Sequence, residues 1–470
     1  MGDRNFVTSR YISNLNVNKM KISKLTISLW LLTFVGLTAL QAQSPKIQFE
    51  EFDLDNGLHV ILHEDHSTPI VAVSVMYHVG SKNEDPNLQG FAHFFEHLMF
   101  EGTKNIERGE YSRYVEKAGG TLNANTSSDR TYYYEILPSN QLELGLWLES
   151  ERMLHAKVDS VGVNTQKKVV IEEKKQNYDN RPYGSLLIEM MKRAYKEHPY
   201  RWTTIGDPDH IRAASIQDFQ DFYDEFYVPN NAVLTIAGDI NKDEARNLAE
   251  KYFADIPRGP EDIYRPQVKE PVKQKQVRDT VYDNIQLPAV IQGYHIPALG
   301  TDDYYAVDML ASLLSEGQSS RLHRRLVDQE ELAMQVMLMP MDMEDPGLAL
   351  TFALPNVGVD PAKVEKVMDE EIQRVRNELI SDRELEKLKN QVESQLVQQN
   401  SSISQRAVNM ARKYTYFENT NLINTEIEKY QSVDKQDIKR VANKYFREDN
   451  RVVLYYLPES QKKSTSQLNQ

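Results

Sequence analysis

Cysteine is absent from the chain, which has 470 residues. Without cysteine there is no disulfide bond, no thiol nucleophile and no thiolate ligand for a metal ion. Thiol-based catalysis and a cysteine-based zinc site are therefore excluded. Any metal that this protein binds must be held by histidine and carboxylate side chains.

Basic residues are also in short supply. The chain has 55 lysine and arginine residues against 69 aspartate and glutamate residues, which gives a formal net charge of -14. A protein whose main partner is a nucleic acid or an anionic membrane needs a basic face, so the charge balance argues against both. The composition, 40% hydrophobic and 26% charged, is typical of a folded protein of two or more domains.

An apolar run, Leu25–Leu40, lies near the N-terminus behind two lysines and is followed by Ala42. A basic start, an apolar stretch and a small residue at the end are typical of a secretory signal peptide. The alternative is a membrane anchor, but the run is short for a spanning helix. We therefore expect residues 1–42 to be a signal segment, with Met1 or Met20 as the true start. The mature protein is expected to be exported, periplasmic or extracellular, with no stable membrane anchor.

The most informative stretch is Gly90–Gly102, which reads GFAHFFEHLMFEG. On a helix, residues four apart lie within about 40° of each other, so His93 and His97 share one face with Glu96 beside them. Two imidazoles suit a zinc ion, and a nearby carboxylate that is not a ligand can accept a proton from water. The order H-x-x-E-H is the inverzincin signature. The alternative is a set of packed histidines, which would leave Glu96 as a charge without a partner on a strongly apolar helix.

The order of the expected helices and strands along the sequence predicts an α+β fold of two homologous domains, each a mainly antiparallel sheet packed with helices. In the first half, the Asn56-Gly57 pair predicts a hairpin turn. Strands are expected at residues 70–79, 121–126, 131–137 and 232–237. Their expected neighbours include helices at residues 108–118, 140–155, 159–178, 215–227 and 242–253.

The second half repeats landmarks of the first. A Glu-Gly pair follows a helix in both halves, at Glu101 and Glu316, and a helix, turn and strand recur around Asn231 and Asn450. The H-x-x-E-H motif is not repeated, so chemistry is expected in one half. The expected division is a zinc-bearing domain at 46–256, a linker at 257–274, a second domain at 275–460 and a polar tail at 461–470.

Three runs of sequence carry a resemblance to a known family. They are YHVGSKNEDPNLQGFAHFFEHLMFEGT, LNANTSSDRTYY and HPYRWTTIGDPDHIRAASIQDFQDFYDEFYVPNNAVL. With the internal repeat, the chain resembles the pitrilysin and mitochondrial-processing-peptidase family of zinc metallopeptidases, in its short two-domain bacterial form. The resemblance covers nearly all of the expected mature chain.

The resemblance implies a role for particular residues. It makes His93 and His97 zinc ligands, Glu173 the third ligand and Glu96 the general base, with one zinc ion per chain. Glu172 is the competitor for the third position, but it lies about 100° further round its helix. The function implied is hydrolysis of peptides by an exported metalloendopeptidase subunit, and the alternative is a non-catalytic scaffold or assembly subunit of the same fold.

The resemblance also implies a place for the substrate. Asn123 and Ala124 match an Asn-Ala pair on an edge strand, which in the family pairs with an extended peptide. The alternative is a plain hairpin strand with a turn-forming asparagine.

Two departures from the family pattern stand out. Gln166 occupies a position that is often glutamate, so a charge near the third ligand is missing. In the second domain, Val327 and Met334 stand where some family subunits present an Arg and a Tyr to the active site. We therefore expect a homologous partner subunit that carries this Arg/Tyr pair, in a heterodimer rather than a homodimer. The nearby Arg321, Arg324 and Arg325 are expected to form a solvated basic face.

Overall fold

The structure is a computed structural model and describes residues 46–462. The expected signal segment, residues 1–42, and most of the expected polar tail lie outside these residues. From Ile47 onward the chain forms one compact unit. Within residues 46–462, no helix is both long and apolar enough to cross a lipid bilayer.

The first half contains a six-stranded sheet in the order β1-β2-β6-β3-β5-β4. All neighbouring strands are antiparallel except β2 and β6. The expected hairpin is present, and Gly57 takes a φ of 89° in its turn, a conformation that suits glycine. The strands are β1 (Glu50–Asp53), β2 (His59–Glu64), β3 (Ile70–Tyr77), β4 (Thr121–Thr126), β5 (Thr131–Pro138) and β6 (Ala232–Gly238).

Helices cover one face of this sheet and bury a large core against it. The strands and helices expected in this half are all found, with ends that differ by a few residues. The helices of the first half are α2 (Phe91–Leu98), α3 (Glu110–Lys117), α4 (Leu142–His155), α5 (Ser160–Lys174), α6 (Leu186–Ala194), α7 (Pro208–Ala213), α8 (Ile216–Phe226) and α9 (Lys242–Phe253).

The second half contains a five-stranded sheet in the order β7-β11-β8-β10-β9, with one parallel pair, β7 and β11. Residues 257–274, which precede it, contain no helix or strand. The strands are β7 (Val277–Asp283), β8 (Ala289–His295), β9 (Ala333–Pro340), β10 (Leu348–Pro355) and β11 (Arg451–Pro458). The helices are α10 (Asp302–Ser315), α11 (Arg321–His323), α12 (Pro361–Asn377), α13 (Asp382–Gln399), α14 (Ile403–Phe417), α15 (Leu422–Ser432) and α16 (Lys435–Tyr445).

The repeat expected from the sequence is visible in matching hydrogen bonds. The Asn231 side chain donates to the carbonyl of Phe226 at 2.8 Å, and the Asn450 side chain donates to the carbonyl of Tyr445 at 2.7 Å. In both halves this bond ties the end of a helix to the start of the strand that follows. The two-part α+β architecture is therefore confirmed.

One helix of each half packs against the sheet of the other half. Helix α14 of the second half packs on the face of β2, β3 and β6 that the first-half helices leave open. Helix α6 of the first half packs on β8 and β11 in the same way, through Met190, Met191 and Ala194. Both sheets are consequently covered on two faces, and the halves share apolar cores.

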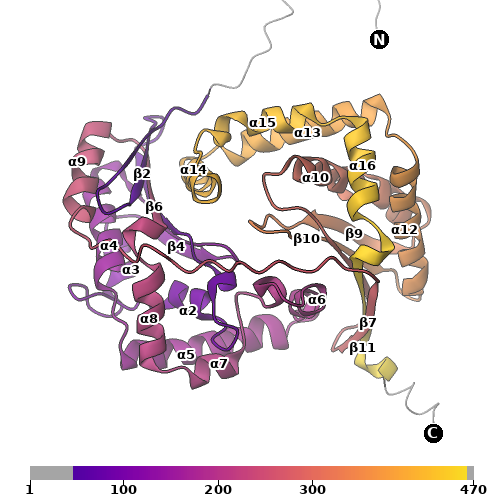
Figure 1. Ribbon diagram of the computed structural model, residues 1–470, viewed down its shortest axis with the longest axis horizontal. Helices are drawn as coiled ribbons and strands as arrows, with labels where there is room; N and C mark the ends of the chain where they lie inside the picture. The colour runs from indigo at the N-terminus through magenta and orange to yellow at the C-terminus, as the bar shows by residue number, and fades with distance from the viewer. Residues whose placement is uncertain (1–45, 463–470) are drawn as a thin grey trace, which may run out of the picture. The chain divides into compact units, whose positions relative to one another are not determined.

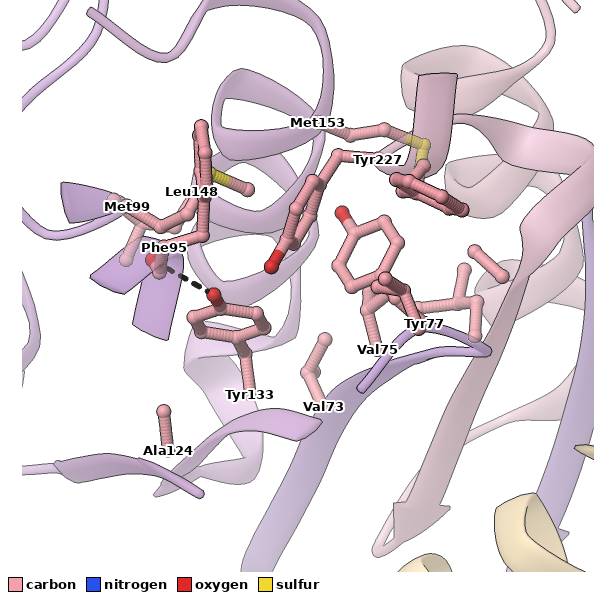
Figure 2. Packing of buried hydrophobic residues seen from close by; sticks show 14 of the residues in the cluster. Val73, Val75, Tyr77, Phe95, Met99, Ala124, Tyr133, Leu148, Met153 and Tyr227 are labelled. Carbon is pink, nitrogen blue, oxygen red and sulfur yellow. Dashed lines mark hydrogen bonds between the residues drawn. The ribbon is translucent and has the colours of Figure 1, made fainter. Parts of the chain in front are cut away.

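The core beneath α2 fixes the position of that helix. Tyr133 of β5 donates a hydrogen bond from its hydroxyl to the carbonyl of Phe95, at 2.9 Å, as Figure 2 shows. The rings of Tyr77 and Tyr227 pack beside this contact with their centroids 4.9 Å apart. A buried hydroxyl needs such a partner, so the bond sets where the helix lies on the sheet.

Candidate metal centre

Helix α2 begins at a buried carboxyl group. Glu84 accepts hydrogen bonds from the backbone N–H groups of Gly90, at 2.8 Å, and of Ala92, at 3.0 Å. Helix N-termini carry unpaired N–H groups and a partial positive charge, so a carboxyl group there is favourable. Burial raises the pKa of Glu84 to about 8. The helix that carries the motif is therefore anchored at its first turn.

The pattern of apolar residues turns the motif residues toward a single site. Phe91, Phe94, Phe95 and Leu98 are buried in the core, whereas the motif residues lie on the remaining face and are partly exposed. The imidazole rings that share this face, His93 and His97, have centroids 4.9 Å apart. The helix therefore delivers both rings to the same place, as its spacing predicts.

Helix α5 brings a carboxylate to these two rings. The Oε2 atom of Glu173 lies 3.5 Å from Nε2 of His93 and 3.3 Å from Nε2 of His97. Among the described residues, these three side chains are the one group of three or more His, Cys, Asp or Glu residues whose ligand atoms could hold a metal ion. The side chains are 12%, 29% and 28% exposed for His93, His97 and Glu173, so the site is sheltered but open to one side.

The geometry fits a tetrahedral zinc ion. Zinc binds imidazole nitrogen and carboxylate oxygen at about 2.0–2.2 Å, which puts neighbouring ligand atoms about 3.4 Å apart. The two distances to Glu173 Oε2 match that spacing. This oxygen is buried and has no hydrogen-bond partner within the part of the chain that the structure describes. A buried carboxylate oxygen without a donor is costly, and a metal ion would satisfy it.

The protonation states also suit a metal. Burial lowers the pKa of His93, which favours the neutral imidazole that a metal ion requires. The nearby imidazole of His97 lowers the pKa of Glu173, which favours its carboxylate form. His93 and Glu173 are therefore held in the forms that coordinate zinc.

The competing carboxylate points away from the histidines. Glu172 has a side chain 55% exposed and pairs with Lys175 at 3.3 Å. Helix α5 ends at Lys174, and a π-helical turn over Lys175–Asp179 follows it. The structure thus brings Glu173 and not Glu172 to the two rings, in agreement with the expected 100° between them.

The carboxylate of Glu96 has a partner that the sequence did not indicate. Thr126 donates a hydrogen bond from its hydroxyl to Oε2 of Glu96, at 2.6 Å. Thr126 is the last residue of β4, and the two residues are 30 positions apart in the sequence. The alternation of β4 puts Thr126 on the same face as the buried Ala124, toward α2. The sequence shows this alternation and so indicates the face on which Thr126 lies. It does not show which helix residue lies opposite.

Asn123 and Ala124 lie on β4, which is at the edge of its sheet. Their neighbour on one side is β5, and the N–H of Ala124 donates to the side-chain oxygen of its own neighbour Asn123, at 2.8 Å. Because β4 has a neighbouring strand on one side only, its other edge can pair with an added strand.

Comparison with known proteins identifies the family. Residues 59–208 match the insulinase family, peptidase family M16, and residues 213–392 match the peptidase M16 inactive domain. The chain belongs to peptidase family M16. The resemblance expected from the motif and its flanking sequences is therefore confirmed.

The similarity to other M16 proteins extends over most of the chain. The zinc protease PqqE of Helicobacter pylori is 32% identical over 438 residues, which cover 92% of this chain and 98% of that protein. A probable mitochondrial-processing peptidase beta subunit of Arabidopsis thaliana is 23% identical, over 83% of this chain and 75% of that one. The crystal structure of a protease from Helicobacter pylori is similar with a TM-score of 0.83 and 31% identity, over 87% of this chain and all of that one.

Gln166, the first departure from the M16 pattern, does not contact the candidate ligands. Its side-chain amide donates to Oε1 of Glu101, at 2.7 Å. The other oxygen of Glu101 receives a hydrogen bond from Arg108. A glutamate in place of Gln166 would put two carboxylates in contact, so the glutamine matches its neighbour.

At the second departure from the M16 pattern, both side chains are apolar. Val327 packs against the core of the second half, and Met334 is 56% exposed on β9. Neither can donate a hydrogen bond. The expectation of a solvated basic face nearby is wrong for two of its three members. Arg321 is paired with Glu384 of α13. Arg325 is paired with Glu370 and Glu371 of α12 and with the nearby Glu330.

Proposed function

We propose that this chain is a zinc metallopeptidase that hydrolyses peptide bonds, with His93, His97 and Glu173 as ligands of one zinc ion. The observation that carries the proposal is the spacing of 3.3–3.5 Å between Glu173 Oε2 and the two Nε2 atoms, at a buried oxygen without a donor. Bound zinc would supply Lewis-acid activation of the scissile carbonyl and of water. The zinc proteases among its M16 relatives support the same assignment.

Glu96 is the general base in this proposal. It lies in the same helical turn as the two histidines but is not in the group of ligand atoms that surrounds the site. Its carboxylate is therefore available to accept a proton from the attacking water. The same group then returns the proton to the leaving amine, so that the reaction balances as hydrolysis of an amide.

The substrate is an extended peptide bound along the free edge of β4. Asn123 and Ala124 lie on that edge, and Thr126 on the same strand contacts Glu96. Main-chain hydrogen bonds to an edge strand hold a peptide without requiring a particular sequence. A peptide bound there would pass beside the motif helix.

A partner subunit is proposed to complete the site. Amide hydrolysis develops negative charge on the carbonyl oxygen, and each donor placed there is worth about 2.7–4 kcal/mol. Val327 and Met334 supply no such donor. We propose that a homologous subunit carrying the Arg/Tyr pair does so in a heterodimer. The purified chain should cleave a quenched peptide library weakly alone and strongly with that subunit. Equal turnover without the subunit would contradict the shared site.

The test of the proposed chemistry is Glu96→Gln, which is nearly isosteric and removes no metal ligand. Zinc content should equal that of the wild-type protein, while peptide hydrolysis should fall by about two orders of magnitude or more. Hydrolysis at the wild-type rate by the zinc-loaded variant would remove Glu96 from the mechanism. Absence of both zinc and hydrolysis in the wild-type protein and its complexes would favour the scaffold function instead.

Export is proposed from the N-terminal sequence, because a basic start, an apolar run and Ala42 are typical of a signal peptide. N-terminal sequencing of the protein recovered outside the cytoplasm should give a chain that begins near Gln43. An extracytoplasmic protein that still begins at Met20 would contradict cleavage.

A further inference from the structure

Thr126, at the end of β4, holds the carboxylate of Glu96 by a hydrogen bond. The hydroxyl donates to Oε2 at 2.6 Å, a distance typical of a strong bond between a hydroxyl and a carboxylate. No other hydrogen bond to this carboxylate is found among the described residues. The Oε1 atom of Glu96 is therefore the one left for exchange of a proton.

The backbone of Thr126 is fixed by the turn that follows it. Thr126 pairs with Thr131 across β4 and β5, and the N–H of Ser127 donates to the carbonyl of Arg130 at 2.9 Å. The turn also accepts from the loop before α2, where the N–H of Lys82 donates to the carbonyl of Ser128 at 2.9 Å. The hydroxyl thus projects from a backbone that is held on two sides.

Buried charges then tie this turn to the second half. Asp129, which is 2% exposed, lies 3.0 Å from the ammonium group of Lys82 and accepts from the N–H of Glu344 at 3.2 Å. The hydroxyl of Tyr200 also donates to Asp129. A buried charge with this many partners resists displacement, because each lost partner would leave a polar group unsatisfied. The position of Thr126 is consequently determined by three separate segments of the chain.

We propose that Thr126 is a positioning residue for the general base. The inference rests on the proposed function, because it assigns to Thr126 the task of orienting Glu96. By holding Oε2, the hydroxyl restricts rotation of the carboxylate and keeps Oε1 directed at the water that attacks the peptide. Since Thr126 ends the strand on which the peptide binds, it also links the placement of the substrate to the placement of the base.

The test is Thr126→Val, which removes the hydroxyl and keeps the branched shape that suits a strand. We expect kcat to fall about tenfold, as for loss of a hydrogen bond to a charged group, with KM and zinc content unchanged. Thr126→Ser retains the hydroxyl and should recover most of the rate. The matched control is Thr68→Val, the same change at an exposed position outside β4, which should leave kcat at the wild-type value.

A double variant tests whether Thr126 acts through Glu96. Adding Thr126→Val to Glu96→Gln should cause no further loss of hydrolysis, because the group that the hydroxyl orients is already gone. Full kcat in Thr126→Val, with hydrolysis lost in Glu96→Gln, would overturn the inference and leave the proposed function standing. An additive further tenfold loss in the double variant would also overturn it. A wild-type protein that hydrolyses nothing, alone or with its partner, would overturn the proposed function and this inference with it.

Discussion

Helices α2 and α10 occupy corresponding places in the two halves but carry different chemistry. When the Glu-Gly pairs that follow the two helices are aligned, the second half has an aspartate, an alanine and a serine where the first has histidine, glutamate and histidine. These residues are Asp308, Ala311 and Ser312. The strand at the sheet edge beside the helix is β4 in one half and β9 in the other. The second half therefore retains the architecture of a site without its ligands.

A second contact is also shared by the halves. The amide of Gln166 donates to Glu101, and the amide of Gln395 donates to Glu316. In both cases a long helix reaches back to the glutamate that follows the first helix. The halves differ just beyond this point. In the first half, the helix continues beyond Gln166 as far as Glu173. In the second half, α13 ends at Gln399, four residues past its glutamine.

The same fold can therefore carry a candidate metal site in one half and lack it in the other. The second half has other side chains at the three motif positions, and α13 ends too soon after its glutamine to carry a counterpart of Glu173, while the sheet and the shared contacts remain. The candidate site consequently depends on a few positions in an architecture that both halves share.

The largest expected effect comes from removing a candidate ligand of the first half, compared with removing the corresponding side chain of the second half. His97→Ala should lose nearly all bound zinc and all measurable hydrolysis, because two ligands hold zinc far more weakly than three. Ser312→Ala, at the corresponding position, should keep both at the wild-type level. Metal content of the purified proteins and a peptide assay measure the two effects. Equal zinc loss from both variants would mean that the halves do not differ as proposed.

The third ligand separates adjacent carboxylates on α5. Glu173→Gln should lower the affinity for zinc by at least about tenfold, since an amide oxygen is a weaker ligand than a carboxylate. Glu172→Gln should bind zinc as the wild-type protein does, because its side chain is exposed and paired with Lys175. Competition against a zinc chelator measures the difference. A variant of Glu172 that lost zinc as readily would contradict the assignment.

The sequence predicted what is set by local spacing. The i, i+4 separation put His93 and His97 on one face, and Asn56-Gly57 marked a hairpin, because both depend on residues close in the chain. The contact of Thr126 with Glu96 and the exchange of α6 and α14 between sheets were not predicted. They depend on which surfaces meet after folding, and the pattern of one segment does not specify its distant partner.

Gln166 shows the same limit in another way. The family pattern led to the expectation of a missing charge near the ligands, but the residue contacts Glu101 instead. A substitution can be interpreted only when its neighbour is known, and here the neighbour lies 65 positions away.

Asp308, which corresponds to His93, lies in surroundings that are unusual for an aspartate. It lies on the wall of a cavity of about 600 Å³ and accepts a hydrogen bond from the hydroxyl of Tyr430 at 2.8 Å. Burial raises the pKa of Asp308 to about 7, and the carboxylates of Asp342, Glu316 and Glu426 add to the effect. At neutral pH the second half therefore keeps a partly protonated acid where the first half keeps a neutral imidazole.

The smallest expected effect follows from this difference and concerns stability. Because the pKa of Asp308 is raised from 3.8 in folding, the folded state binds the proton more tightly. The stability that this proton contributes is fully present below about pH 4 and is lost as the pH rises through about 7. Between about pH 5.5 and pH 7.5, the wild-type protein should lose about 2 kcal/mol of unfolding free energy that Asp308→Asn does not lose.

Urea unfolding of the two proteins at the two pH values measures the difference, and titrations shared by both cancel. Asp255→Asn, an exposed position in the first half, is the control and should follow the wild-type protein at both pH values. Asparagine still accepts the bond from Tyr430, so the variant isolates the charge rather than the contact. If wild-type and Asp308→Asn proteins lost stability in parallel, the aspartate would be ionised throughout this range. The helix position that holds a candidate zinc ligand in the first half would then carry an ordinary acid in the second.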